Sequence, residues 1–259
     1  MLPEIRGPQY RLVRYLFAAM FAILAISSVP ASAVEFQVAV AANFAVPAQK
    51  IAAQFERTTG HKAVLSFGST GRFFTQIRSG APFDILLAAD HETPLKLAQD
   101  AVPGSQFTYA IGTLVLWSAD PRLVDSEGAV LKQGHFQHLA IASPVLAPYG
   151  AAAMQTLQAL HLVEATKPKV VQGESIGQTF AFVATGNAEI GFVALSQVWE
   201  GNALKSGSIW VVPNDLYEPI RQDAILLRHG ADNAAARAFL DYLKTDAATA
   251  VMRAYGYHF

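Results

Sequence analysis

Short apolar runs alternate with amphipathic stretches from residue 35 onward. The runs are rich in Val, Ile, Leu and Ala, whereas the stretches between them repeat apolar residues at helical spacing. This alternation is typical of an α/β protein in which helices cover a parallel sheet. In the first part of the chain, the pattern predicts strands at 36–41, 63–66 and 84–88, and helices at 46–58, 73–79 and 94–101.

The middle of the chain repeats this alternation of apolar runs and amphipathic stretches. Loops that follow the strands in either part would lie at the carboxyl edge of a sheet, where ligands bind in open α/β proteins. The chain closes with two amphipathic helices, 234–243 and a second that ends near Tyr255. In the middle, the pattern predicts strands at 139–142, 169–171 and 190–194, and helices at 151–160 and 178–185.

Two longer strand-like runs, 109–117 and 220–227, bound this middle part. Each run is long enough to leave one sheet and enter another. The sequence therefore predicts two α/β lobes joined by two crossover strands, with helix N-termini from both lobes directed at the cleft between them. The expected limits are 34–112 plus 222–259 for lobe I, and 113–221 for lobe II.

The first 33 residues have the features of a secretory signal. Three arginines precede the uncharged run 16–26, and Ala31-Ser32-Ala33 fits the small-x-small cleavage pattern. The run is too short to span a bilayer comfortably, and no later segment has about 20 uninterrupted apolar residues. We expect cleavage after Ala33 and a soluble exported protein. The alternative is a retained N-terminal anchor helix, which fits this length and these flanks less well.

The charge and the cysteine content exclude several kinds of partner and site. The chain has 19 Lys+Arg and 20 Asp+Glu, and removal of residues 1–33 leaves 16 basic against 19 acidic residues. A net charge near −3 argues against nucleic acid, whose partners normally carry a basic patch. The chain has no cysteine, which excludes disulfides, thiolate metal sites and a lipid-modified N-terminal cysteine.

The glycine-punctuated segment Ser66–Arg72 is the first candidate site. It stands between a predicted strand and a predicted helix, so its backbone can turn tightly and present unpaired amides to an anion. A phosphate-binding P-loop is excluded, because the spacing and the lysine of that motif are missing. The alternative is that these hydroxyl residues only cap the following helix.

Ser175 is a rival candidate, as the centre of a Gly-x-Ser-x-Gly pattern between a predicted strand and helix. Asp215 or Asp223, and then His229 or His258, would complete the chain order of a serine hydrolase. Against this, no oxyanion segment of the His-Gly-Gly type precedes the serine. The seven histidines show no His-Glu-x-x-His spacing, so no metal site is expected.

Five segments in order resemble one family, the periplasmic molybdate-binding proteins of ABC importers, known as ModA. The resemblance covers essentially the whole chain after residue 33, and Gly80-Ala81-Pro82-Phe83-Asp84 with its following strand is the most specific segment. It implies a two-lobed periplasmic binding protein of type II with two crossover hinge strands. The five segments are 41–44, 66–72, 80–90, 147–150 and 191–194.

The resemblance also implies a set of ligand-binding positions. Lobe I would contribute Ala42 and Asn43 after the first strand, and Ser69 and Thr70 from the second loop. Lobe II would contribute Tyr149, and through a backbone amide Ile176, so that Ser175 would cap a helix whose amides bind an anion. The expected ligand-binding residues are Ala42, Asn43, Ser69, Thr70, Tyr149 and Ile176.

The implied function is binding of molybdate or tungstate in the periplasm and delivery to the membrane permease of an ABC importer, as a monomer without a cofactor or enzymatic activity. Many members have serine at the position of Asn43, and a tyrosine ligand at the position of Ala194, so no ligand is assigned to Ala194. Arg72 is expected on the rim, because the family binds its dianion with neutral donors. The alternatives are another oxyanion, such as sulfate, and the Ser175 hydrolase.

Overall fold

The computed structural model describes residues 33–259, and residues 34–259 form one compact unit. The predicted signal, residues 1–33, therefore lies outside the described residues except for Ala33. Within 33–259, no helix combines the length and the apolar character needed to cross a membrane.

Lobe I is built on a five-stranded sheet in the order β2-β1-β3-β12-β4. β1, β2 and β3 are parallel, whereas β12 runs antiparallel to both of its neighbours. The strands are β1 (Glu35–Ala41), β2 (Lys62–Gly68), β3 (Ile85–Leu87), β4 (Phe107–Gly112) and β12 (Ile220–Leu226).

Lobe II is built on a second five-stranded sheet with an equivalent order, β11-β5-β8-β6-β7. Here β6 is parallel to β7 and β8, and β5 is the antiparallel strand beside β8. The strands are β5 (Leu114–Ser118), β6 (Leu139–Ala142), β7 (Val170–Gly173), β8 (Ile190–Ala194) and β11 (Ser208–Val211), with a separate hairpin of β9 (Trp199–Glu200) and β10 (Ala203–Leu204).

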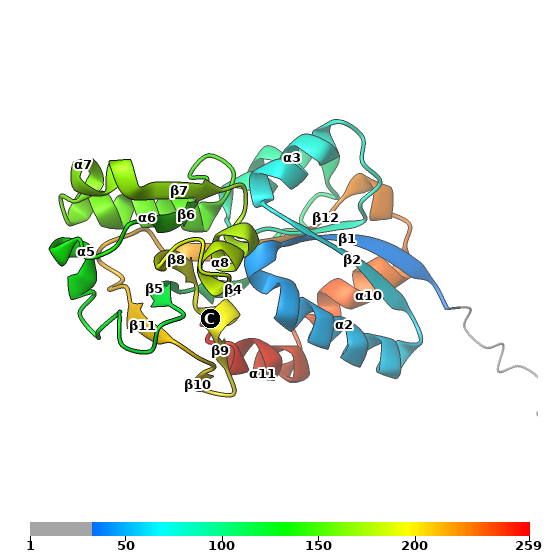
Figure 1. Ribbon diagram of the computed structural model, residues 1–259. Helices are drawn as coiled ribbons and strands as arrows, with labels where there is room; N and C mark the ends of the chain where they lie inside the picture. Colours follow the sequence, from blue (N-terminus) through cyan, green and yellow to red (C-terminus); the bar gives the residue numbers. More distant parts are fainter. Residues whose placement is uncertain (1–32) are drawn as a thin grey trace, which may run out of the picture. The chain divides into compact units, whose positions relative to one another are not determined.

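Helices cover both faces of the first sheet (Figure 1). Val38 and Val40 of β1 are buried in one core together with α2, α10 and α11, whereas Ala39 is buried in another core with α3. This follows from the alternation of side chains along a strand. The helical segments of lobe I are η1 (Ala42–Phe44), α2 (Ala45–Thr59), α3 (Thr70–Arg78), α4 (Glu92–Lys96), η2 (Ala98–Asp100), η4 (Arg228–Gly230), α10 (Ala234–Tyr242) and α11 (Asp246–Ala254).

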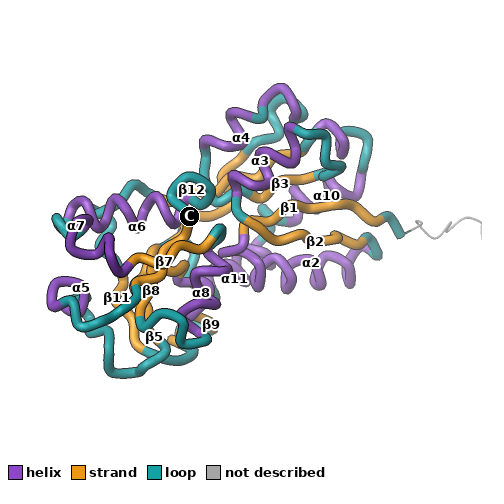
Figure 2. Tube along the Cα trace, turned by 45° about the horizontal axis from the view of Figure 1, so that its top comes forward, coloured by secondary structure: helices purple, strands orange, loops and turns teal. Residues whose placement is uncertain are grey.

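The second sheet is covered in the same way, with α6 packed in one core and α8 in the other. Figure 2 shows these helices on opposite sides of the lobe II strands. The helical segments of lobe II are α5 (Ala129–Gln133), α6 (Pro148–Ala159), α7 (Val163–Thr166), η3 (Lys167–Lys169), α8 (Ile176–Ala184) and α9 (Leu195–Val198).

The chain passes between the two sheets twice. β4 ends at Gly112 and β5 begins at Leu114, so Thr113 alone separates a strand of one sheet from a strand of the other. The return passage lies within 212–219, between β11 and β12. The lobe limits drawn from the sequence remain a prediction.

Among the helices whose first turns contain the candidate site residues, three predicted starts were wrong in the same direction. α3 was expected from residue 73 but begins at Thr70, α6 was expected from 151 but begins at Pro148, and α8 was expected from 178 but begins at Ile176. Residues that were expected in loops therefore belong to the first turns of helices, and this changes which backbone groups they offer.

Candidate functional site

A small cavity lies between the lobes, where strands of both sheets end. All six positions implied by the resemblance line it, and no residue of its wall carries a formal charge. Their role in binding remains a prediction, but the fold does bring them together. The wall consists of Ala41, Ala42, Asn43, Gly68, Ser69, Thr70, Ala89, Ala147, Pro148, Tyr149 and Ile176.

Four helical segments begin at this cavity. η1 starts at Ala42 and α3 at Thr70 in lobe I, while α6 starts at Pro148 and α8 at Ile176 in lobe II. The first N–H groups of a helix have no partner within it, and the helix dipole places partial positive charge at the same end. An uncharged cavity surrounded by such groups can hold an anion without any lysine or arginine.

Two hydroxyl groups of lobe I add to these backbone donors. Thr70 Oγ1 accepts a hydrogen bond from the Ala89 amide at 3.0 Å, which leaves the hydroxyl hydrogen available to a ligand. Ser69 is 5% exposed, and its Oγ has no hydrogen-bond partner within the described part of the chain. A buried hydroxyl without a partner is costly, so a ligand oxygen at this position would satisfy it.

The side chain of Asn43 is more constrained than the sequence indicated. Its Nδ2 donates to Gln222 Oε1 at 2.8 Å and to Tyr257 Oη at 2.9 Å. Its Oδ1 is buried without a partner among residues 33–259. In this orientation both side-chain hydrogens of Asn43 are used within the protein, and the group left over is an acceptor.

The phenol of Tyr149 is directed at β4 and β12 of lobe I. The residue is 1% exposed, and its Oη accepts a hydrogen bond from Gln222 Nε2 at 3.1 Å. A Cβ on Gly112 would lie 2.0 Å from this oxygen, so only glycine leaves room for the phenol. Burial raises the pKa of Tyr149 well above its usual value, which keeps the hydroxyl protonated.

Two contacts join the lobes at the edge of the site. The Gly71 amide donates to the Leu146 carbonyl at 2.9 Å, which connects the first turn of α3 to the loop before α6. Arg72 Nη1 lies 3.7 Å from Glu174 Oε2, and both side chains are largely exposed. Arg72 is not part of the cavity wall, so its position agrees with the expected rim.

Comparison with known proteins identifies the family. A family model described as bacterial extracellular solute-binding protein matches residues 36–258. The molybdate-binding protein ModA of Azotobacter vinelandii is 61% identical over 229 residues, which cover 88% of this chain and 91% of that protein. ModA of Rhodobacter capsulatus is 54% identical over 232 residues, which cover 89% and 90%. This chain belongs to the ModA family.

The fold agrees with this assignment. The solved structure of an Azotobacter vinelandii periplasmic molybdate-binding protein matches with a TM-score of 0.84 at 41% identity, covering 86% of this chain and 99% of that one. The two-lobed α/β fold predicted from the sequence is therefore confirmed.

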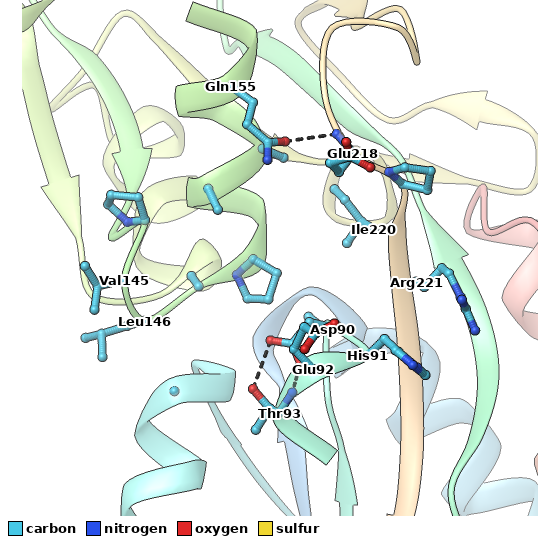
Figure 3. Close-up of a pocket in the computed structure, with 18 residues that line it drawn as sticks. Asp90, His91, Glu92, Thr93, Val145, Leu146, Gln155, Glu218, Ile220 and Arg221 are labelled. Carbon is cyan, nitrogen blue, oxygen red and sulfur yellow. Dashed lines mark hydrogen bonds between the residues drawn. The ribbon is translucent and has the colours of Figure 1, made fainter. Parts of the chain in front are cut away.

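A larger cavity of about 650 Å³ adjoins the small one and shares part of its wall. Figure 3 shows Asp90 and Glu92 on one side of it and Glu218 on the other. Three carboxylates in one cavity disfavour a dianion, although His91 and Arg221 also line it. Of the two cavities in this ModA family member, the small uncharged one is therefore the candidate anion site.

The hydrogen bonds of Ser175 and His229 do not support the serine hydrolase alternative. Ser175 is the N-cap of α8, and its Oγ accepts a hydrogen bond from the Gln178 amide at 3.3 Å. His229 Nδ1 lies 3.0 Å from Asp84 Oδ1, so this histidine is paired with a carboxylate other than the two that a triad would use. The serine thus has the capping role that the resemblance implied.

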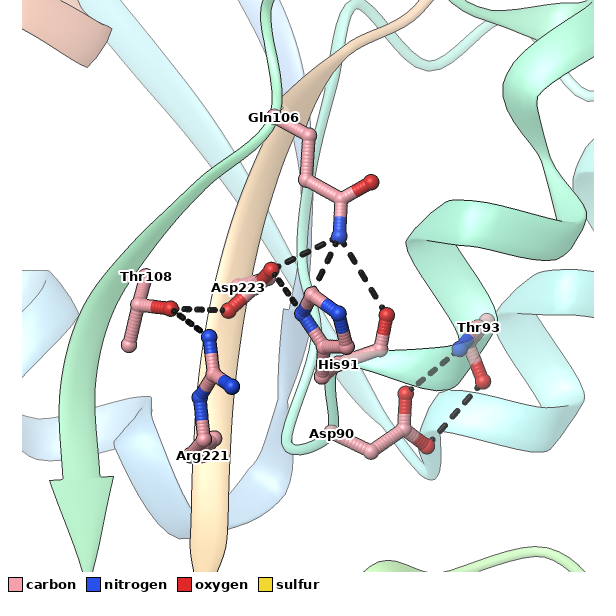
Figure 4. Close-up of polar contacts among 7 residues, drawn as sticks. All are labelled: Asp90, His91, Thr93, Gln106, Thr108, Arg221 and Asp223. Carbon is pink, nitrogen blue, oxygen red and sulfur yellow. Dashed lines mark hydrogen bonds and ion pairs between the residues drawn. The ribbon is translucent and has the colours of Figure 1, made fainter.

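Asp223 is likewise engaged elsewhere (Figure 4). It is 1% exposed, and its Oδ2 lies 2.7 Å from His91 Nδ1 and accepts from Gln106 Nε2 at 2.7 Å. Its Oδ1 accepts from Thr108 Oγ1 at 2.7 Å. These partners hold the carboxylate between β4, β12 and the start of α4.

Sequence reasoning missed Gln222 and Gly112 near this site. Gln222 is fully buried in β12 and touches both Asn43 and Tyr149. The available signal was the uncharged polar residue Gln222 inside the strand-like run 220–227, which was expected to cross between the lobes. A buried amide needs partners, so its presence there indicated a polar cluster.

Proposed function

We propose that this protein binds molybdate, and also tungstate, in the periplasm and delivers it to the membrane permease of an ABC importer. The observation that carries the proposal is the uncharged cavity at which helices of both lobes begin. The similarity to molybdate-binding ModA proteins of Azotobacter vinelandii and Rhodobacter capsulatus supports the choice of ligand. The protein acts as a monomer, without a cofactor and without catalysis.

The donors in this proposal are neutral. The backbone N–H groups at Asn43, Thr70, Tyr149 and Ile176 and the hydroxyls of Ser69 and Thr70 replace the water that the dianion loses. Hydrogen bonds to a charged group are worth about 1.5–3 kcal/mol each, so several of them can offset the desolvation of the anion. Because these donors stand on rigid helix starts, their spacing discriminates by size, and the smaller sulfate is left with long, weak bonds.

Closure of the lobes completes the site. Residues of lobe I and lobe II each supply only part of the wall, so the anion stabilises the arrangement in which both are present. The Gly71 to Leu146 hydrogen bond belongs to this arrangement. The closed form is then the one that the permease recognises.

Calorimetry on the chain from Val34 onward tests the proposal. We expect tight binding of molybdate and tungstate, with a preference of at least about 100-fold over sulfate, equivalent to about 2.7 kcal/mol. Equal affinity for sulfate or phosphate would reject molybdate as the ligand while retaining an oxyanion-binding role. No binding of any tetrahedral oxyanion would reject the function altogether.

A further inference from the structure

Gln222 connects cavity residues of the two lobes through a single carboxamide. Its side chain is fully buried in β12. Nε2 donates to Tyr149 Oη of lobe II at 3.1 Å. Oε1 accepts from Asn43 Nδ2 of lobe I at 2.8 Å and from Tyr109 Oη at 3.0 Å. Any change in the orientation of this amide therefore alters hydrogen bonds in both lobes.

The local backbone is built to hold Gln222 in this place. The β12 to β4 ladder shifts register here, because Gln222 pairs with Ala110 while the next residue pairs with Thr108, leaving Tyr109 without a partner in the ladder. Such a bulge redirects side chains. A Cβ on Gly112 would lie 2.5 Å from Gln222 Nε2, so the neighbouring strand has no room for a side chain at that position.

The hydrogen-bond directions along Asn43, Gln222 and Tyr149 depend on one another. Asn43 presently donates both of its side-chain hydrogens to protein atoms, and its unpartnered oxygen cannot donate to an anion. If the Asn43 amide turns so that Nδ2 replaces Oδ1, its oxygen comes to face Gln222. Gln222 must then turn as well and donate to that oxygen, and its own oxygen accepts the hydroxyl of Tyr149.

We infer that Gln222 is a positioning residue for the anion site, which sets whether Asn43 presents a donor or an acceptor and couples that choice to Tyr149 in the opposite lobe. This inference rests on the proposed function, because it assumes that an oxyanion occupies the cavity. It assigns the selection of the Asn43 orientation to a residue that does not line the cavity itself.

No group that titrates near neutral pH contacts the Gln222 amide among the described residues. Its ionisable neighbours are Tyr109, Tyr149 and Tyr257, and burial raises the pKa of all three above the usual value. On β12 itself, Asp223 is bound to His91, Gln106 and Thr108. Molybdate binding by the natural protein should therefore vary little between about pH 6 and 8.5, since tyrosine normally titrates near 10.

A double-mutant cycle with sodium molybdate separates positioning from a merely structural role. We expect Gln222→Met to weaken binding about tenfold, as for one lost charge-assisted hydrogen bond. In the Asn43→Ala background the same substitution should have little further effect, because the residue through which it acts is gone. An equal loss in both backgrounds, or no loss from Gln222→Met, would overturn the inference. Failure of the natural protein to bind molybdate would instead reject the proposed function.

Gln222→Glu provides a second readout that does not depend on shape. An ionised carboxylate only accepts, so it fixes Asn43 Nδ2 away from the anion, whereas a protonated carboxyl can again donate. Calorimetry should show weak molybdate binding at pH 8.5 that recovers toward pH 6.

Gln155→Glu, which places the same charge in the adjoining cavity, is the control and should show a smaller loss of affinity. In the Asn43→Ala background most of the loss caused by Gln222→Glu should disappear. Binding by Gln222→Glu equal to that of the natural protein at every pH, or an undiminished loss in that background, would contradict the positioning role.

Discussion

Replacement of Gly71 by alanine should weaken anion binding without a contact to the anion. Gly71 is the second residue of α3 and lies against the backbone of Leu146 in lobe II. A Cβ at position 71 would lie 3.0 Å from the Leu146 Cα and 3.1 Å from its carbonyl oxygen. These are backbone atoms, so Leu146 must give way by a few tenths of an ångström, which loosens the contact between the lobes.

The size of the effect follows from this geometry. Overpacking by one methyl group costs about 1–3 kcal/mol when its neighbours cannot move. This free-energy cost applies only when the lobes are in contact, as they are in the anion-bound state, so it lowers the affinity for the anion. A cost of this size corresponds to about 5- to 150-fold weaker binding. The anion-free protein should keep its stability or gain about 0.5–1 kcal/mol, since alanine is a better helix residue than glycine.

Calorimetry with molybdate and urea unfolding without anion measure the two quantities separately. Ser79→Ala, at the exposed opposite end of α3, is the matched control and should leave both quantities within about 0.5 kcal/mol of the natural protein. If Gly71→Ala binds molybdate as tightly as the natural protein, then contact between these backbones is not part of the bound state.

Three further outcomes are expected. Thr70→Val, which removes the hydroxyl and keeps the shape, should weaken molybdate binding about 10- to 150-fold, whereas Thr70→Ser should restore most of it; unchanged calorimetry for the valine variant would exclude the hydroxyl as a ligand. Arg72→Ala should lower affinity less than about fivefold, because its exposed pair with Glu174 is worth about 0–1 kcal/mol, and a much larger loss would place the guanidinium against the anion. Burial raises the folded-state pKa of Tyr257, so the unfolded chain releases this proton first and the free energy of unfolding should fall above about pH 10. Tyr257→Phe should reduce the slope of this free energy against pH, measured by urea unfolding, by about 1.4 kcal/mol per pH unit. An unchanged slope would contradict this reasoning.

The sheets were the most predictable part of the fold. The strands at 139–142 and 190–194 have the predicted limits, and Gly60 ends α2 in the left-handed conformation with φ of 75°. Continuous apolar runs bounded by turn residues leave few other interpretations. β11 was missed because its four residues, 208–211, alternate in burial and stand among polar residues.

The starts of the helices at the site were harder to predict, and glycine explains the error. Gly71, Gly150 and Gly177 each stand in the first turn of a site helix, where glycine reads as a helix breaker. In the structure, a Cβ at these positions would meet Leu146, the Ala142 carbonyl and Ala42 respectively. The approach leaves no room for a side chain at Gly150 and is tight at Gly71 and Gly177, and a single sequence does not display such packing against neighbouring segments.

The candidate site could be predicted only in part. The resemblance indicated six positions, and the fold gathers them around one cavity. It did not indicate that the Asn43 amide is engaged by Gln222 and Tyr257, because these residues lie 179 and 214 positions away in the chain. Side-chain orientation in a buried network depends on such long-range partners.

A crystal structure with tungstate tests the central claim most directly, because the heavy atom locates the anion without reference to any assumed contact. The account predicts one tungstate in the uncharged cavity, within hydrogen-bond distance of the Thr70 hydroxyl and of first-turn amides of α6 and α8. Tungstate bound instead in the adjoining cavity beside His91 and Arg221, or in neither cavity at saturating concentration, would contradict it.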